Sequence, residues 1–268
     1  MWHENCLPNS IHAAPWQIQK HDFDTPVKLD ETSIKSLLLQ KFRAAKRLNT
    51  KSIIASEWVL GRTGNRADLA IWNGKLIGVE IKSKFDSLER LENQIQNYKK
   101  CFDEVVVVLA EKHLEHGISL IGEGVELWSI DNNAELKIKL AQTRPSEPDP
   151  KTLVSFLSQS QLKDVTRHLT ESGGYSDRRK VATSLPINQL RQTVAESFKK
   201  SFQSTTEAFW EEVGRGKIQP SHIRKLSRFQ SRRDAWNQAQ IFEHELWQNW
   251  KSVVCSEFDQ VAIAPTAG

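Results

Sequence analysis

Three side chains in the first half of the chain have the types and the spacing to handle a divalent cation and a phosphate. Asp68 lies in one strand-like run, and Glu80 and Lys82 form a Glu-x-Lys triplet in the next. Mg²⁺ keeps several waters and needs few protein ligands, so one or two carboxylates are enough to hold it. A nearby lysine can stabilise the charge that builds on a phosphate under attack. The pattern therefore indicates phosphodiester chemistry with Mg²⁺ or Mn²⁺.

A hairpin must bring these three side chains together. Residues 66–72 and 76–84 have the composition of strands, and the Asn73-Gly74 pair between them is a strong hairpin signal. Side chains alternate along a strand, so Glu80 and Lys82 share one face. A two-residue loop would send Asp68 to the opposite face, whereas a three-residue loop with a bulge restores the match. We therefore expect a loop of odd length.

The elements around the hairpin predict an α/β core with a mixed sheet. Asp30 suits the N-cap of a helix that precedes a strand at 52–60, and a helix over 87–101 precedes a buried strand at 104–110. Gln94 and Tyr98 lie one turn apart on a face of that second helix. Short strand-like pieces follow near 118–121, 125–130 and 136–140. The order helix, three strands, helix, strand implies helices flanking a mixed sheet.

Three segments together resemble the PD-(D/E)XK nuclease superfamily, in its RecB/Cas4-like branch. They are Arg66-Ala67-Asp68, Gly78 to Lys84, and Gln94-x-x-x-Tyr98. The resemblance implies a restriction-endonuclease-like αβββαβ core. It also implies that Asp68, Glu80 and the Ile81 carbonyl hold Mg²⁺ or Mn²⁺, with Glu31 or Glu57 as a possible additional ligand. The catalytic residues that it implies are Asp68, Glu80, Lys82, Gln94 and Tyr98. Two departures are that Ala67 replaces the family's proline, and that the iron–sulfur cysteines of the branch are missing.

The function expected from this resemblance is a divalent-metal-dependent deoxyribonuclease acting in DNA repair, recombination or defence against phages and mobile elements. Two alternatives stay open: a catalytically silent nucleic-acid-binding module, and a subunit of a larger DNA-processing complex. A purely structural hairpin with solvated charges also fits the pattern. The expected partner is duplex or branched DNA.

The chain divides into four predicted parts. Residues 1–27 look like an irregular arm, 28–143 like the nuclease-like domain, 144–150 like a proline-rich linker, and 151–268 like a helical domain. No apolar run approaches the roughly 20 residues that span a bilayer, and no secretory signal is visible. We therefore expect a cytoplasmic protein without a membrane partner.

The predicted helical domain carries the excess of positive charge. Residues 151–268 contain 17 basic and 12 acidic side chains, a difference of +5, whereas residues 1–150 contain 20 basic and 21 acidic ones, a difference of −1. On one helix, Lys225, Arg228 and Arg232 would share a face. The candidate nucleic-acid contacts are Arg62, Arg66, Lys84, Arg178, Arg179, Lys225, Arg228 and Arg232.

Two aromatic stripes in the second half predict the core of a helical bundle. They are Val194, Phe198, Phe202 and Phe209, and then Trp236, Phe242, Leu246 and Trp250. A homodimer or another protein partner through these helices is left open.

Overall fold

The computed structural model describes residues 29–61, 64–141, 144–169 and 174–228, and within 236–250 all positions except 237, 244, 248 and 249. The strands are β1 (Ile53–Val59), β2 (Arg66–Trp72), β3 (Leu76–Lys82), β4 (Glu104–Ala110), β5 (Glu126–Ile130) and β6 (Leu136–Leu140). The helices are α1 (Glu31–Ala44), α2 (Leu91–Lys99), η1 (Glu111–His113), α3 (Leu114–Ile121), α4 (Pro150–Ser155), α5 (Gln159–Thr166), α6 (Tyr175–Thr183), α7 (Ile187–Val213), α8 (Pro220–Ile223) and η2 (Arg224–Leu226).

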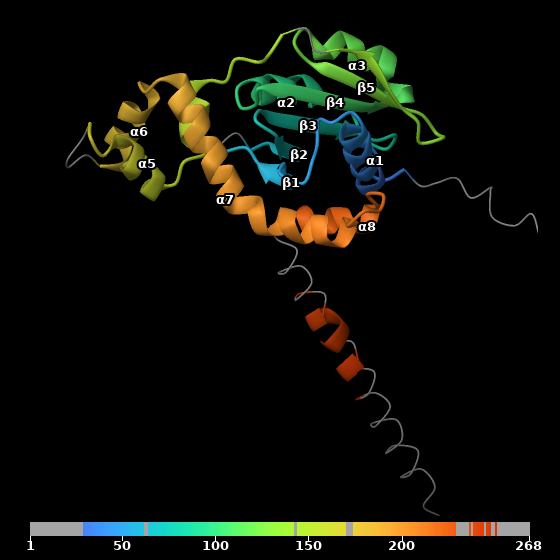
Figure 1. Cartoon of the computed structure of the whole chain (residues 1–268). Coiled ribbons are helices and arrows are strands. Elements are labelled where there is room, and N and C mark those ends of the chain that lie inside the picture. Colours follow the sequence, from blue (N-terminus) through green and yellow to red (C-terminus); the bar gives the residue numbers. More distant parts are fainter. Residues whose placement is uncertain are drawn as a thin grey trace, which may run out of the picture.

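The strands form one mixed six-stranded sheet in the order β1-β2-β3-β4-β5-β6 (Figure 1). The pairs β1–β2, β2–β3 and β5–β6 are antiparallel, whereas β3–β4 and β4–β5 are parallel. The prediction of an α/β fold with a mixed sheet and a C-terminal helical region is confirmed. The order helix, three strands, helix, strand at its start is confirmed as well. The sheet has six strands where the resemblance implied four.

The loop between β2 and β3 has the predicted odd length. Trp72 pairs with Leu76, which leaves the three residues 73–75 in the turn, and Gly74 has a φ of +109° that favours glycine. The Asn73 side chain accepts a hydrogen bond from the Lys75 N–H at 3.2 Å and closes the turn.

Both faces of the sheet are covered. The first face packs α2 through Leu91, Ile95 and Tyr98, together with α4, α5 and the start of α7. The opposite face packs α1 and the end of α7. Helix α1 begins where Asp30 accepts a hydrogen bond from the Ser33 N–H at 2.8 Å, which confirms the predicted N-cap. Strand β3 is buried along its whole length, so its charged residues must find partners inside the protein.

Helix α7 crosses the β1 edge of the sheet and joins the two cores (Figure 1). Phe198 and Phe202 belong to the first core, and Phe209 belongs to the second. Between them, the Thr206 hydroxyl accepts a hydrogen bond from the Ile54 N–H and donates one to the Ile54 carbonyl, each at 3.0 Å. A helix therefore satisfies the backbone of an edge strand that would otherwise be open to pairing. The predicted stripe at 194–209 is confirmed as core.

The structure contradicts two predictions about secondary structure and packing. Residues 118–121 end helix α3 and form no strand, because Gly117 packs closely on Leu109 and Ile121 is buried at helical spacing. A four-residue apolar run cannot distinguish these two structures. The second stripe is exposed at Trp236, Phe242, Leu246 and Trp250, so it forms no bundle core.

Candidate functional site

The hairpin places Asp68 opposite Glu80. The β2–β3 pairing runs from Trp72–Leu76 to Leu69–Val79, and one further step brings Asp68 across from Glu80. There the Ile81 N–H donates to the Asp68 carboxylate oxygen Oδ2 at 2.6 Å, so the side chain takes the place of a backbone acceptor. The neighbouring strand β1 is distorted at the same level, where Glu57 has a φ of +60°.

Glu80 is the most enclosed charge in this region, with 2% of its surface exposed. The Lys82 ammonium donates to Glu80 Oε1 at 2.6 Å, and the Tyr98 hydroxyl donates to Glu80 Oε2 at 2.5 Å. The Tyr98 oxygen also lies 3.0 Å from the Arg66 carbonyl. Strand β3 and helix α2 thus present these three side chains to one another, and both oxygens of Glu80 have a partner.

Helix α1 adds a second lysine that the sequence analysis missed. Lys35 is buried, and its ammonium lies 2.5 Å from Glu31 Oε1 and 3.1 Å from the Ser56 hydroxyl. The Ser56 hydroxyl in turn lies 3.4 Å from the Asp68 carbonyl oxygen. The available signal was a lysine beside Ile34 on the apolar side of the helix, four residues after Glu31. We call Glu31, Lys35, Asp68, Glu80, Lys82 and Tyr98 the carboxylate cluster.

The electrostatics of the carboxylate cluster disfavour negative charge on Asp68. Burial raises the pKa of Asp68 well above its usual range, and the charges of Glu80 and then Glu31 raise it further. Lys35 and the Ile81 N–H act in the opposite direction. Burial, followed by the charges of Glu80 and Asp68, also raises the pKa of Tyr98. At Asp68, burial and the neighbouring carboxylates therefore outweigh the opposing effects of Lys35 and the Ile81 N–H.

Two further residues were predicted for the site, Glu57 as a possible metal ligand and Gln94 as a catalytic residue. The Glu57 carboxylate lies 3.5 Å from the Arg66 guanidinium. The Gln94 side-chain oxygen is buried and has no hydrogen-bond partner among the described residues. In the described part of the chain, no three His, Cys, Asp or Glu side chains are arranged to hold a metal ion, so neither Glu31 nor Glu57 completes such a set.

Two of the predicted nucleic-acid contacts come together beside the cluster. Arg228 and residues 56–59 of β1 line a small pocket of about 80 Å³. Arg66 pairs with Glu57 on the wall of that pocket. Lys84 follows the end of β3 and is exposed. The fold thus brings Arg228, far along the chain, to the strand that neighbours Asp68.

The remaining predicted contacts do not join this surface. Arg178 and Arg179 lie in α6, at the opposite end of α7 from α8 (Figure 1). Lys225 pairs with Glu212 at 3.4 Å. The expected helical stripe is wrong for its described members, because η2 ends at Leu226 and Ser227 is extended, so Lys225 and Arg228 share no α-helix. Arg62 and Arg232 lie outside the described residues.

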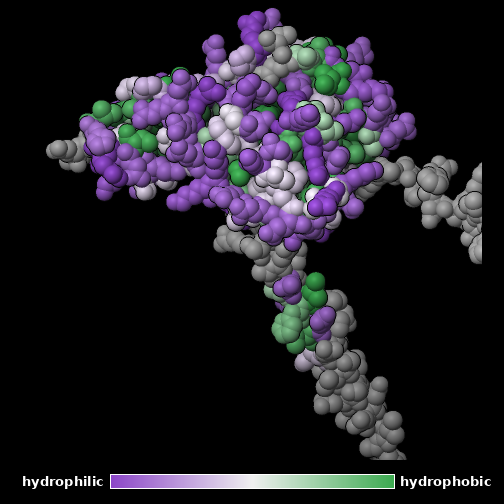
Figure 2. Space-filling view, in the orientation of Figure 1, coloured by the Kyte–Doolittle hydropathy of each residue, from purple (hydrophilic) through white to green (hydrophobic). Residues whose placement is uncertain are grey.

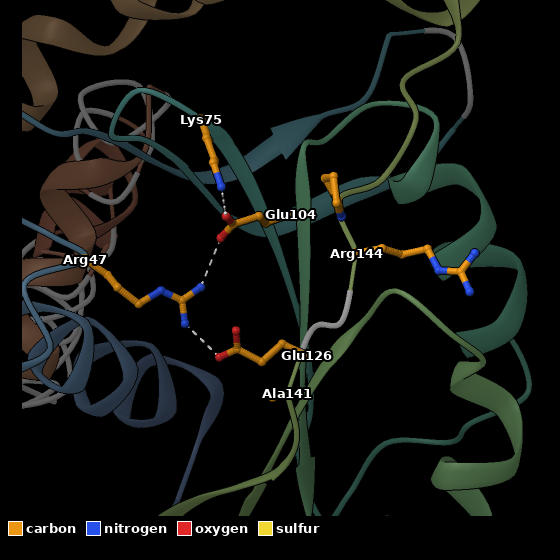
Figure 3. Close-up of a pocket in the computed structure, with 7 residues that line it drawn as sticks. Arg47, Lys75, Glu104, Glu126, Ala141 and Arg144 are labelled. Carbon is orange, nitrogen blue, oxygen red and sulfur yellow. Dashed lines mark hydrogen bonds and ion pairs between the residues drawn. The ribbon is translucent and has the colours of Figure 1, made fainter.

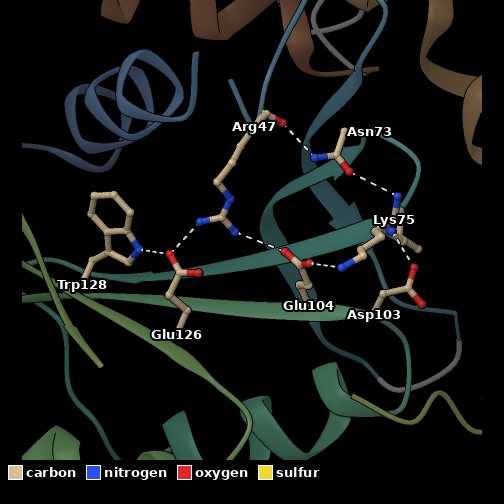
Figure 4. A network of polar contacts seen from close by, with 8 residues as sticks. Arg47, Asn73, Lys75, Asp103, Glu104, Glu126 and Trp128 are labelled. Atoms are coloured by element: carbon tan, nitrogen blue, oxygen red, sulfur yellow. Dashed lines mark hydrogen bonds and ion pairs between the residues drawn. The ribbon is translucent and has the colours of Figure 1, made fainter. Parts of the chain in front are cut away.

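A second polar cluster lies at the other end of the strands. Arg47 donates to Glu104 at 3.2 Å and to Glu126 at 2.7 Å, while Lys75 donates to Glu104 at 2.8 Å (Figure 3). The Trp128 indole N–H completes the contacts of Glu126 (Figure 4). A pocket of about 410 Å³ opens beside these residues. Because basic and acidic groups are matched here, this cluster fastens the segment after α1 to β4 and β5.

No helix among the described residues is both long and apolar enough to cross a membrane.

Comparisons with known proteins place most of the chain in a phage family. The family model described as Bacteriophage P4 protein cII matches residues 25–227. Protein cII of Enterobacteria phage P4 is 30% identical over 215 residues, which cover 77% of this chain and 81% of that protein. A solved structure, the SPO1766 protein of unknown function from Silicibacter pomeroyi, aligns with a TM-score of 0.34 and 16% identity, over 56% of this chain and 99% of that one.

These matches correct the predicted family. The resemblance to PD-(D/E)XK nucleases, the nuclease function and the roles in repair, recombination or defence are wrong, because the family model and the phage relative both point to protein cII. The physical reason is that a short pattern of Asp, Glu-x-Lys and Gln-x-x-x-Tyr fixes where charges lie but not what they contact. Here Lys82 and Tyr98 are both engaged by Glu80.

Proposed function

The chain belongs to the bacteriophage P4 protein cII family, and on that premise we propose that it is a DNA-binding protein whose Asp68–Glu80 pair takes a divalent cation. The observation that carries the proposal is the placement of these two carboxylates on neighbouring strands, where burial and then the Glu80 charge disfavour negative charge on Asp68. Like charges held together by a fold are stabilised when a cation joins them.

The chemistry of the donor set fits Mg²⁺ or Mn²⁺. Asp68, Glu80 and the Ile81 carbonyl offer oxygen ligands only, which hard cations prefer, and two carboxylates are enough for an ion that keeps its waters. A bound cation supplies positive charge that neutralises the carboxylates and attracts phosphate oxygens. Lys82 already occupies Glu80 Oε1, so the ion pair and the cation compete for that oxygen. Cation binding is therefore expected to be moderate in strength.

The surroundings of the cluster support a polyanion as the partner. Arg66 is exposed at the start of β2, Arg228 lines the pocket beside β1, and Lys84 is exposed beyond the end of β3. Arginine and lysine side chains on such a rim contact the phosphate backbone and give binding that weakens with salt. The cation and this rim together would hold DNA by its backbone, with no sequence reading required.

Fluorescence anisotropy of a labelled DNA duplex, titrated with the protein at constant ionic strength, tests the proposal. Adding Mg²⁺ should tighten binding by the wild-type protein about tenfold, the effect of one extra charge-assisted contact. Asp68→Asn should lose this gain. Asp164→Asn is the matched control, because Asp164 is exposed on α5 and pairs with Arg167 of the same turn. Equal affinity with and without Mg²⁺, or an undiminished gain in Asp68→Asn, would refute the proposal.

A further inference from the structure

A second surface of the chain lies in residues 236–250. Every described position in this segment is helical, and its large apolar side chains are open to solvent, with exposed fractions from 53% for Leu246 to 64% for Trp236. Hydrophobic atoms gather there, away from the sheet (Figure 2). The contrast with α7 is sharp, because the aromatic stripe of α7 is buried against β1. An exposed apolar stripe of this kind marks an interaction site.

The exposed side chains gather on one side of the helix. At 100° per residue, five of them fall within an arc of about 140°; they are Trp236, Phe242, Leu246, Trp247 and Trp250. The rings of Trp247 and Trp250 lie 5.5 Å apart and meet edge to face. With Leu246 and Glu243 they line a hollow of about 350 Å³. This stripe, which we call the tryptophan face, therefore offers both an apolar ridge and a recess that can receive side chains.

We propose that the tryptophan face binds the same face of a second copy of this chain and forms a symmetric dimer. Large aromatic side chains bury about 150–250 Å² each, so the exposed parts of the five side chains of this face amount to roughly 600 Å² per chain. Stable protein interfaces bury about 1,200–2,000 Å² in total, counting both partners. Pairing two such faces therefore supplies about the smallest area that a stable dimer needs.

The charges of residues 236–250 distinguish a second copy from a lipid surface. The segment contains Glu243 and Glu245 and no lysine or arginine. A membrane is a poorer match, because helices that lie on anionic lipid carry lysine and arginine on their polar side.

Sedimentation equilibrium of the full chain tests this inference. The wild-type protein should show twice the mass of the 30.7 kDa chain at micromolar concentration. Leu246→Glu and Trp250→Glu each bury a charge in the face, and each should weaken the dimer by about 30-fold or more, as at an aromatic hot spot. Gln238→Glu is the control, because Gln238 is exposed on the polar side of the same helix and its substitution should leave the dimer intact.

Three outcomes would overturn the inference. The first is a wild-type chain that remains monomeric up to roughly 100 µM, well above the dissociation constant expected for such an interface. The second is a dimer that both face variants retain. The third is a monomer that binds vesicles of phosphatidylglycerol through Trp250, which would assign the face to a lipid surface. Thermal unfolding of each variant, compared with the wild type, shows whether the sheet domain has kept its fold.

Discussion

Replacing Lys82 by methionine should destabilise the protein strongly, because it leaves the buried Glu80 without its counter-charge. Lys82 is 7% exposed and lies 2.6 Å from Glu80, which is 2% exposed. Removing one partner of a buried ion pair costs about 3–5 kcal/mol, since the remaining charge stays desolvated. Methionine keeps the length of the lysine stem, so little packing is lost. The free energy of unfolding should fall by that amount.

Urea unfolding followed by circular dichroism measures the change, and the chain supplies a matched control. Glu135, just before β6, and Lys137, on β6, form the same Glu-x-Lys pair at 2.9 Å, but both side chains are more than half exposed. Lys137→Met should leave stability unchanged within error, because exposed pairs contribute little. The double variant Glu80→Gln, Lys82→Met should recover most of the loss, since both charges are then gone.

Two results would contradict the expected effect of the Glu80 charge on stability. One is a Lys82→Met protein as stable as the Lys137→Met control. The other is a double variant no more stable than Lys82→Met alone, which would mean that the effect comes from packing and not from the Glu80 charge. Mg²⁺ should also restore stability to Lys82→Met more than to the wild type, because it no longer competes with an ammonium group.

Three further perturbations test other parts of the account. The pKa of Asp68 is raised in the folded protein, so the folded protein binds that proton more tightly than the unfolded chain does. Stability should therefore fall as pH rises from about 4, the carboxyl pKa in the unfolded chain, to the folded-state pKa of Asp68. Urea unfolding at a series of pH values should show this slope, and Asp68→Asn should flatten it. Thr206→Val leaves the Ile54 N–H buried without a partner and should cost about 1–3 kcal/mol, read by thermal unfolding. Gly78→Ala would set a Cβ 2.3 Å from the Phe102 ring and should cost about 1–3 kcal/mol by overpacking, whereas Gly74→Ala in the open turn clashes with nothing and tests backbone conformation alone.

Periodicity and turn chemistry were enough to predict the elements that build the site. Asp30 as an N-cap, the unbroken valines of β4 and the Asn73-Gly74 turn are local features, and each determines its own backbone. The odd loop was predicted from chemistry, because only that parity places Asp68 with Glu80, and the register agrees. The pairing of Asp68 with Glu80 across the hairpin could therefore be predicted from residues close in sequence.

Contacts between distant segments could not be predicted in this way. Lys35 reaches Ser56 from another element, and Thr206 reaches Ile54 across more than half of the chain. The types and local spacing of residues do not indicate which distant side chains will contact one another. The same limit explains the wrong family, since the motif gave the positions of Glu80, Lys82 and Tyr98 but not that they bind one another. The second aromatic stripe failed for a related reason, because amphipathicity predicts that a face is covered but not by what.

The most direct test of the proposed cation site is a crystal of the protein soaked in Mn²⁺, with anomalous diffraction recorded near the manganese absorption edge. A peak is expected between the carboxylates of Asp68 and Glu80, absent from Asp68→Asn crystals, with the Lys82 ammonium displaced from Glu80 Oε1. A map without a peak at that position at saturating Mn²⁺, with Lys82 still 2.6 Å from Glu80, would contradict it. The carboxylate cluster would then be a closed ion-pair network that stabilises the fold and binds no cation.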